Sequence, residues 1–205
     1  MMRPQIPSPD QADNKLNNYG IYLQLHYGRV LELGPYDGTD TVYLAKAADV
    51  VIAVEARLEN ARATRERLIA HGIHNAMVVE ANLETLDLCS LGQFDCVWAS
   101  GILYHVPRPD VLIRRITDVT ELCFGWTHLT AAPTGQRNGY AGRHYSEPGD
   151  VLSGMSDHSW WLTPDDFMRI WTDLGWECEF TTVPMPHPNG DLAAQFMAHK
   201  RMDTK

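Results

Sequence analysis

Five short apolar runs alternate with helix-like segments along most of the chain, and this alternation is the strongest constraint on the fold. The runs at 29–33, 49–55, 75–82, 94–100 and 122–130 have the length and continuous hydrophobicity of strands buried on both faces. Segments at 39–48, at 58–71 and from Arg108 onward carry helix-start signals or one apolar face. Strands that alternate with helices predict a parallel sheet with helices on both faces.

The end of the chain predicts a different pairing. A helix is expected from Thr163 to Gly175, followed by strand-like runs at 176–183 and 192–199. A short Pro/Asn/Gly link joins the two runs, which is typical of an antiparallel hairpin. We therefore predict an α/β, Rossmann-like fold with a seven-stranded mixed sheet in a single domain, 1–205. Its expected parts are an N-terminal arm and helix (1–27), a binding core (28–130), an irregular lid or substrate segment (131–162) and a C-terminal helix and β-hairpin (163–205).

Composition narrows the class of protein. The chain has 205 residues, 44% of them hydrophobic, and a net charge of −9. Acidity disfavours a nucleic-acid partner, although a local basic patch would still leave RNA open. We expect no membrane segment, no signal peptide and, since the four cysteines form no C-x-x-C pair, reduced thiols in a cytoplasmic protein.

The stretch "RVLELGPYDG" places a glycine turn directly after the first predicted strand. Gly34 and Gly38 allow a tight turn, while Tyr36 replaces the middle glycine of a dinucleotide-binding loop. Glu55, at the end of the second predicted strand, can accept both hydroxyls of a ribose. The pair predicts a nucleoside ligand, and the alternatives are plain turn glycines and an exposed carboxylate. Glu32 beside the loop would repel pyrophosphate, which disfavours NAD.

Four segments in order extend this pattern: "VLELGPYDG", "VIAVEA", "EANLETL" and "FDCVWASGILYHVPRP". With them, residues 19–130 resemble the class I S-adenosylmethionine (SAM)-dependent methyltransferases. The last segment resembles the fourth motif of a branch that reads G-[IV]-L-Y-H. That branch includes small-molecule methyltransferases and tRNA wobble-uridine carboxymethyltransferases. The resemblance implies SAM as cofactor and S-adenosylhomocysteine (SAH) as product.

The resemblance also implies a set of cofactor-binding residues. Asn82 stands where the family commonly has aspartate, and Ser100 stands where metal-dependent catechol-type members carry an acidic ligand, so no metal is predicted. The expected cofactor contacts are Tyr19, Glu32, Gly34, Pro35, Tyr36, Asp37, Gly38, Glu55, Ala56, Arg57, Asn82, Leu83, Ser100 and Gly101.

The acceptor side is less defined by sequence. His105 and His128 are the candidate catalytic bases, with a structural hydrogen bond as the alternative role for each. The candidate substrate contacts are Tyr104, His144, Tyr145, His158 and Trp160. Trp161, like Trp160, would suit an apolar or aromatic acceptor, and packing of the lid on the sheet is the alternative for both. His144, Asp157 and His158 could also bind a metal, but their spacing fits no template.

The sequence thus predicts methyl transfer from SAM to a small molecule at oxygen. The alternatives are an RNA-modifying methyl- or carboxymethyltransferase, a non-catalytic SAM-binding protein and an NAD-dependent oxidoreductase. The sequence leaves the acceptor and the oligomeric state open.

Overall fold

The computed structural model describes residues 26–182, 184–186 and 191–201. The predicted N-terminal arm and helix, with Tyr19, lie outside these residues, apart from the last two positions. Tyr27 already belongs to the first strand, which begins two residues earlier than the sequence predicted. No helix in the described part of the chain is long and apolar enough to span a bilayer.

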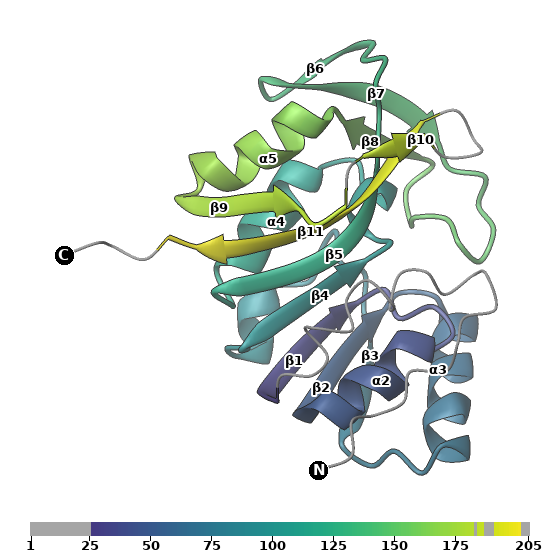
Figure 1. Cartoon of the computed structure of the whole chain (residues 1–205). Coiled ribbons are helices and arrows are strands. Elements are labelled where there is room, and N and C mark those ends of the chain that lie inside the picture. The colour runs from purple at the N-terminus through teal and green to yellow at the C-terminus, as the bar shows by residue number, and fades with distance from the viewer. Residues whose placement is uncertain (1–25, 183, 187–190, 202–205) are drawn as a thin grey trace.

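The main sheet is mixed, as predicted (Figure 1). Its order is β10-β11-β5-β4-β1-β2-β3, and β9 also pairs with β11. The strands β1 to β5 run parallel, whereas β11 runs antiparallel to β5. Their bounds are β1 (Tyr27–Leu33), β2 (Ala48–Glu55), β3 (Ala76–Glu80), β4 (Cys96–Ser100), β5 (Leu122–Leu129), β9 (Trp176–Phe180), β10 (Met185–Pro186) and β11 (Leu192–Lys200).

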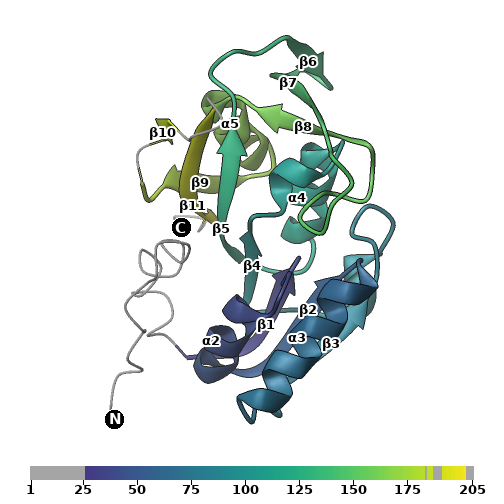
Figure 2. The same cartoon turned by 90° about the vertical axis from the view of Figure 1, so that its right-hand side faces the viewer.

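Helices cover both faces of this sheet. Successive residues of a strand point to opposite faces, and the strands accordingly contribute to two separate apolar cores. In β1, Val30 belongs to the core beneath α2, whereas Leu31 belongs to the core beneath α4 and α5. Figure 2 shows α2 and α3 side by side over β1 to β3. The helices are α2 (Thr39–Ala47), α3 (Leu58–Ala70), α4 (Pro109–Thr117) and α5 (Pro164–Asp173), with single turns η2 (Leu88–Leu91) and η3 (Leu103–His105).

The edge strand of the C-terminal hairpin is broken. The sequence predicted one strand over 176–183, but β9 and β10 pair with successive parts of β11. Within the described residues the sheet therefore has eight strands rather than the predicted seven. Pro184 and Pro186 lie in this stretch. Proline has no backbone N–H to donate to a ladder, which confines it to edges and breaks.

The predicted irregular segment 131–162 is irregular only in part, because nearly half of its residues lie in strands. It contains β6 (Gly135–Arg137), β7 (Tyr140–Ser146) and β8 (His158–Leu162), which form a second, antiparallel sheet above the end of β5 (Figure 1). Asn138 and Gly139, with φ of 54° and 83°, form the two-residue turn between β6 and β7. Only 147–157, between β7 and β8, is an extended loop, which we call the lid loop.

Candidate active site

A cavity of about 420 Å³ lies at the carboxyl ends of the parallel strands. Ligands of open α/β sheets bind at this end. The loops after β1 to β4 form its floor, and the end of β5 adds Trp126 and His128. The opposite side of the cavity is closed by Tyr145, Trp161 and most of the lid loop, namely residues 147–155 other than Gly149.

The loop after β1 turns through left-handed backbone conformations. Gly34 and Gly38 have φ of 69° and 81°, and Tyr36 between them has φ of 55°. A Cβ on Gly34 would come within 3.0 Å of Ile102, and one on Gly38 within 2.9 Å of the Thr64 backbone. Both positions therefore favour glycine for conformation, and Gly38 is also required for space because the Thr64 backbone cannot move away. Tyr36 keeps the conformation that glycine would adopt, at a steric cost.

Tyr36→Gly should raise the free energy of unfolding of the unliganded protein by about 1 kcal/mol, because glycine adopts positive φ without strain. Tyr36→Ala is the matched control, since alanine removes the same ring but keeps the strain. Urea denaturation of both variants measures the difference. Equal stability of the glycine and alanine variants would show that the Tyr36 backbone is not strained.

Glu55 holds a fixed carboxylate at the tip of β2. Its side chain is 7% exposed and lines the cavity. Oε1 accepts a hydrogen bond from the Arg57 backbone N–H at 2.8 Å, and Oε2 accepts one from the Tyr36 N–H at 3.3 Å. Burial raises the pKa of Glu55, although these backbone hydrogen bonds act in the opposite direction. These two backbone N–H donors fix the carboxylate in the cavity wall, where it can accept hydrogen bonds from the hydroxyl groups of a ligand.

Several predicted cofactor residues do not reach the cavity but lie in or beneath the loop after β1. Among the described residues, Glu32, Pro35, Asp37 and Gly38 are not part of the cavity wall. Glu32 is 1% exposed, and burial together with the nearby Asp40 carboxylate raises its pKa well above the ordinary range. Asp37 accepts from Arg67 at 2.5 Å and from the Thr39 N–H at 3.0 Å, which ties the loop to α3 and α2.

The remaining predicted cofactor residues within the described chain line the cavity. These are Gly34, Tyr36, Glu55, Ala56, Arg57, Asn82, Leu83, Ser100 and Gly101. Asn82 Oδ1 accepts the Glu84 N–H at 2.9 Å, which fixes the amide at the end of β3. Ser100 Oγ is buried and has no partner among the described residues, so it is available to a ligand.

Aromatic rings surround the other end of the cavity. His128 stacks on Trp161 with ring centroids 4.7 Å apart, and Tyr145 stacks on the same indole at 4.4 Å. Tyr104 meets His128 edge-on at 4.5 Å, and Trp126 lies 5.6 Å from Tyr104. We call these five residues the aromatic box. Tyr104, His128 and Tyr145 were predicted from sequence, Trp161 was considered beside Trp160 as a contact for an aromatic acceptor, and Trp126 was not predicted.

Three predicted substrate contacts lie elsewhere. His144, His158 and Trp160 are not among the described residues that line the cavity. In the register of β7 and β8, His144 is opposite Trp160, whereas Tyr145 and Trp161 are on the other face. The rings of His144 and His158 stack at 5.2 Å, and His158 contacts Asp157 at 2.7 Å. The described residues contain no group of three side chains arranged to bind a metal.

His105 is paired with a carboxylate that the sequence did not predict. Its Nδ1 lies 3.0 Å from Glu147 Oε2, and the Glu147 side chain is 1% exposed. Burial has the largest single effect and would raise the pKa of Glu147, but the hydrogen bond from His105, the Ser159 hydroxyl, the charge of His105 and the hydrogen bond from the Gly154 N–H together lower the pKa overall. An ionised Glu147 accepts the Nδ1 proton, which leaves the lone pair on Nε2. His128 instead has its Nδ1 3.4 Å from the neutral Leu192 carbonyl oxygen.

Residues 30–121 match a family model described as a methyltransferase domain. No curated protein sequence matches the chain. The solved N-terminal domain of EvdMO1, in the presence of SAH and D-fucose, is 28% identical with a TM-score of 0.82, over 95% of this chain and 84% of that one.

Two further solved structures are similar over most of the chain. The EvdMO1 crystal structure is 25% identical with a TM-score of 0.69 over 93% of this chain, which spans 41% of that longer chain. The 1,6-didemethyltoxoflavin-N1-methyltransferase of Burkholderia thailandensis is 17% identical with a TM-score of 0.68, over 94% of this chain and 80% of that one. At that identity the likeness concerns the fold alone.

Proposed function

We propose that this chain, a SAM-dependent methyltransferase, methylates a hydroxyl group of a small, sugar-like ring compound. The observation that carries the proposal is the contact of His105 with Glu147, 3.0 Å apart at the cavity. A nitrogen acceptor that is neutral needs no base, whereas a hydroxyl must lose its proton as the new bond forms.

The residues of the cavity fit SAM. We propose that Glu55 accepts the ribose hydroxyls, because its carboxylate is already oriented by two backbone N–H groups. Asn82 and Leu83 would lie beside the adenine, and Ser100 Oγ, buried without a partner among the described residues, would meet a polar group of the methionine part. When bound, SAM supplies a methyl group on a positively charged sulfur.

His105 is proposed as the base. Its Nε2 would take the acceptor's hydroxyl proton while the oxygen–methyl bond forms and the sulfur–methyl bond breaks, leaving SAH. The Glu147 carboxylate would stabilise the imidazolium that results, as a carboxylate does for histidine in other dyads. His128, which stacks on Trp161 and lies 3.4 Å from the Leu192 carbonyl oxygen, would serve as a hydrogen-bonding member of the aromatic box.

The aromatic box supports a ring-shaped acceptor. A pocket with aromatic walls and few polar groups suits a compact molecule whose hydroxyl groups are fixed by those polar groups. The solved EvdMO1 domain, 28% identical to this chain, was crystallised in the presence of D-fucose, which is such a molecule. The net charge of −9 counts against the alternative of an RNA acceptor.

The test is transfer of label from methyl-labelled SAM. D-fucose and its nucleotide-linked and glycoside forms should accept the label, and NMR of the product should show a methyl ether. Unmodified tRNA and a primary amine of similar size are the comparison acceptors. Methylation of tRNA or of the amine alone would contradict the proposal.

A further inference from the structure

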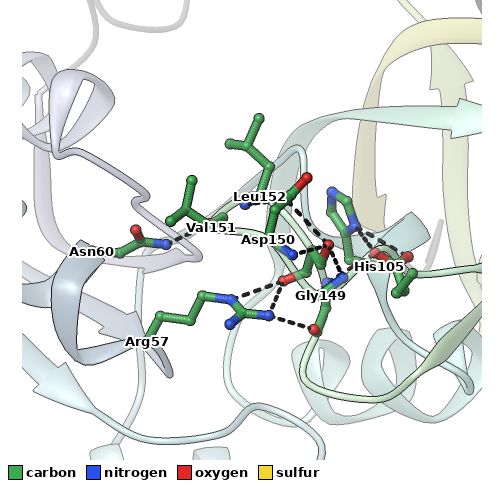
Figure 3. Close-up of polar contacts among 10 residues, drawn as sticks. Arg57, Asn60, His105, Gly149, Asp150, Val151 and Leu152 are labelled. Atoms are coloured by element: carbon green, nitrogen blue, oxygen red, sulfur yellow. Dashed lines mark hydrogen bonds and ion pairs between the residues drawn. The ribbon is translucent and has the colours of Figure 1, made fainter.

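Two residues of the cofactor side hold the lid loop by its backbone. Arg57 donates from Nη2 to the Gly154 oxygen at 3.0 Å, and from Nη2 and Nε to the Ser153 oxygen at 3.2 and 3.3 Å. Asn60, in the first turn of α3, donates from Nδ2 to the Val151 oxygen at 2.9 Å. Figure 3 shows Arg57 and Asn60 reaching the loop from the same side. The middle of the lid loop is therefore fastened to the segment that directly follows Glu55.

The same loop carries the partner of His105. Glu147, its first residue, accepts from His105 Nδ1 at 3.0 Å and from the Gly154 N–H, also at 3.0 Å. Gly154 thus contacts both Arg57 and Glu147, because its carbonyl oxygen accepts from Arg57 while its N–H donates to Glu147. A continuous series of contacts joins Glu55, Arg57, Gly154, Glu147 and His105, since the Arg57 N–H also donates to Glu55.

The position of Gly154 leaves no space for a side chain. A Cβ at this position would lie 2.0 Å from the His105 carbonyl oxygen, far inside van der Waals contact. The loop reaches this position only because residue 154 is glycine. Its neighbours Val151, Leu152 and Met155 line the cavity yet are 44%, 58% and 48% exposed, as expected for a loop that covers a site without belonging to the core.

We propose that Arg57 is a positioning residue that couples cofactor binding to assembly of the base. Occupation of the Glu55 end fixes Arg57, Arg57 holds the lid loop closed, and the closed loop brings Glu147 to His105. The base is therefore complete only when the lid loop is closed, and a bound cofactor would favour that closed position. The closure rests on contacts alone, whereas its effect on turnover rests on the proposed function.

Closure can be measured without any acceptor. Hydrogen exchange of residues 147–157 should slow when SAH saturates the wild-type protein. In Arg57→Ala that protection should be lost at saturating SAH, and Arg57→Lys should restore part of it. Arg62→Ala, an exposed arginine on the same helix, is the matched control and should behave as wild type. Wild-type protection of the loop in SAH-saturated Arg57→Ala would overturn the proposal.

Turnover measurements test the second part of the proposal, the effect of lid closure on the His105 base, separately from closure itself. With an acceptor in hand, Arg57→Ala should lower kcat about 10- to 100-fold and raise the KM for SAM less than that. Gly154→Ala, whose added Cβ has no space at this position, should show the same split with Arg57 intact. Loss of loop protection with unchanged kcat would overturn the link to the base. Failure to find a hydroxyl acceptor would count against the proposed function and leave the exchange result standing.

Discussion

His105→Asn should lower kcat by about 10²- to 10⁴-fold, the usual contribution of a general base, while leaving SAH affinity nearly unchanged. Asparagine is a selective substitution, because its Nδ2 can take the place of the ring Nδ1 and keep the hydrogen bond to Glu147. The group that it removes is Nε2, the proposed proton acceptor. Single-turnover methylation of the identified acceptor, with SAH binding measured by calorimetry, separates chemistry from cofactor affinity.

The control for this variant is His74→Asn, which makes the same change at an exposed position after α3. His128→Asn should lower turnover less than His105→Asn, because the proposed proton acceptor is His105 and His128 is assigned to the wall of the aromatic box. Near-normal rates in His105→Asn would show that His105 is not the base. A larger loss at His128 than at His105 would transfer that role to His128.

Glu55→Ala should weaken SAH binding about 10²- to 10⁴-fold. Two hydrogen bonds from ribose hydroxyls to an ionised carboxylate contribute about 1.5–3 kcal/mol each, and 1.4 kcal/mol is tenfold in affinity. The variant also removes the acceptor that holds the Tyr36 and Arg57 backbone N–H groups. Calorimetry measures the affinity, and circular dichroism with thermal unfolding shows whether the fold is kept.

Glu59→Ala is the matched control, because Glu59 is an exposed glutamate on the neighbouring turn of α3. Its SAH affinity should equal that of the wild type. Unchanged affinity in Glu55→Ala would show that the ribose does not contact this carboxylate, and the cofactor would then need another orientation in the cavity.

The pH dependence of SAH binding should follow Glu55. Protonation removes the acceptor, so affinity is full where the carboxylate is ionised and falls as the pH drops through its pKa. Burial raises that pKa above the ordinary 4.5, and the loss therefore begins at a higher pH than for an exposed glutamate. Glu55→Gln should bind weakly and flatten this part of the profile. A wild-type affinity that stays constant down to pH 4.5 would contradict the assignment.

The sequence predicted the sheet because its strands are continuous apolar runs, and it predicted Glu55 because a strand end fixes where a side chain must lie. The small sheet of β6 to β8 was missed, although Asn138-Gly139 is a strong signal for a two-residue hairpin turn. With that hairpin assigned, β-strand alternation would have separated Trp161, which faces the cavity, from Trp160, which does not.

Glu147 could not have been found in this way. It lies in a loop without periodicity, and its partner His105 is 42 residues earlier in the chain. The pairing depends on how the lid loop folds back, which is decided by Gly154 and by the Arg57 contacts rather than by local sequence. Trp126 was missed for a related reason, because the predicted strand 122–130 gave no indication of which of its residues would meet the lid.

The hydrogen bonds that hold the lid loop have a consequence for how specificity for the acceptor can evolve. Arg57 and Asn60 bind only carbonyl oxygens, so the side chains at Val151, Leu152 and Ser153 take no part in these contacts. Val151 and Leu152 nevertheless line the cavity. Substitutions there can reshape this side of the pocket while the contacts of Arg57 and the His105–Glu147 contact stay intact. We therefore expect variation at these two positions to change which acceptor fits without loss of lid closure.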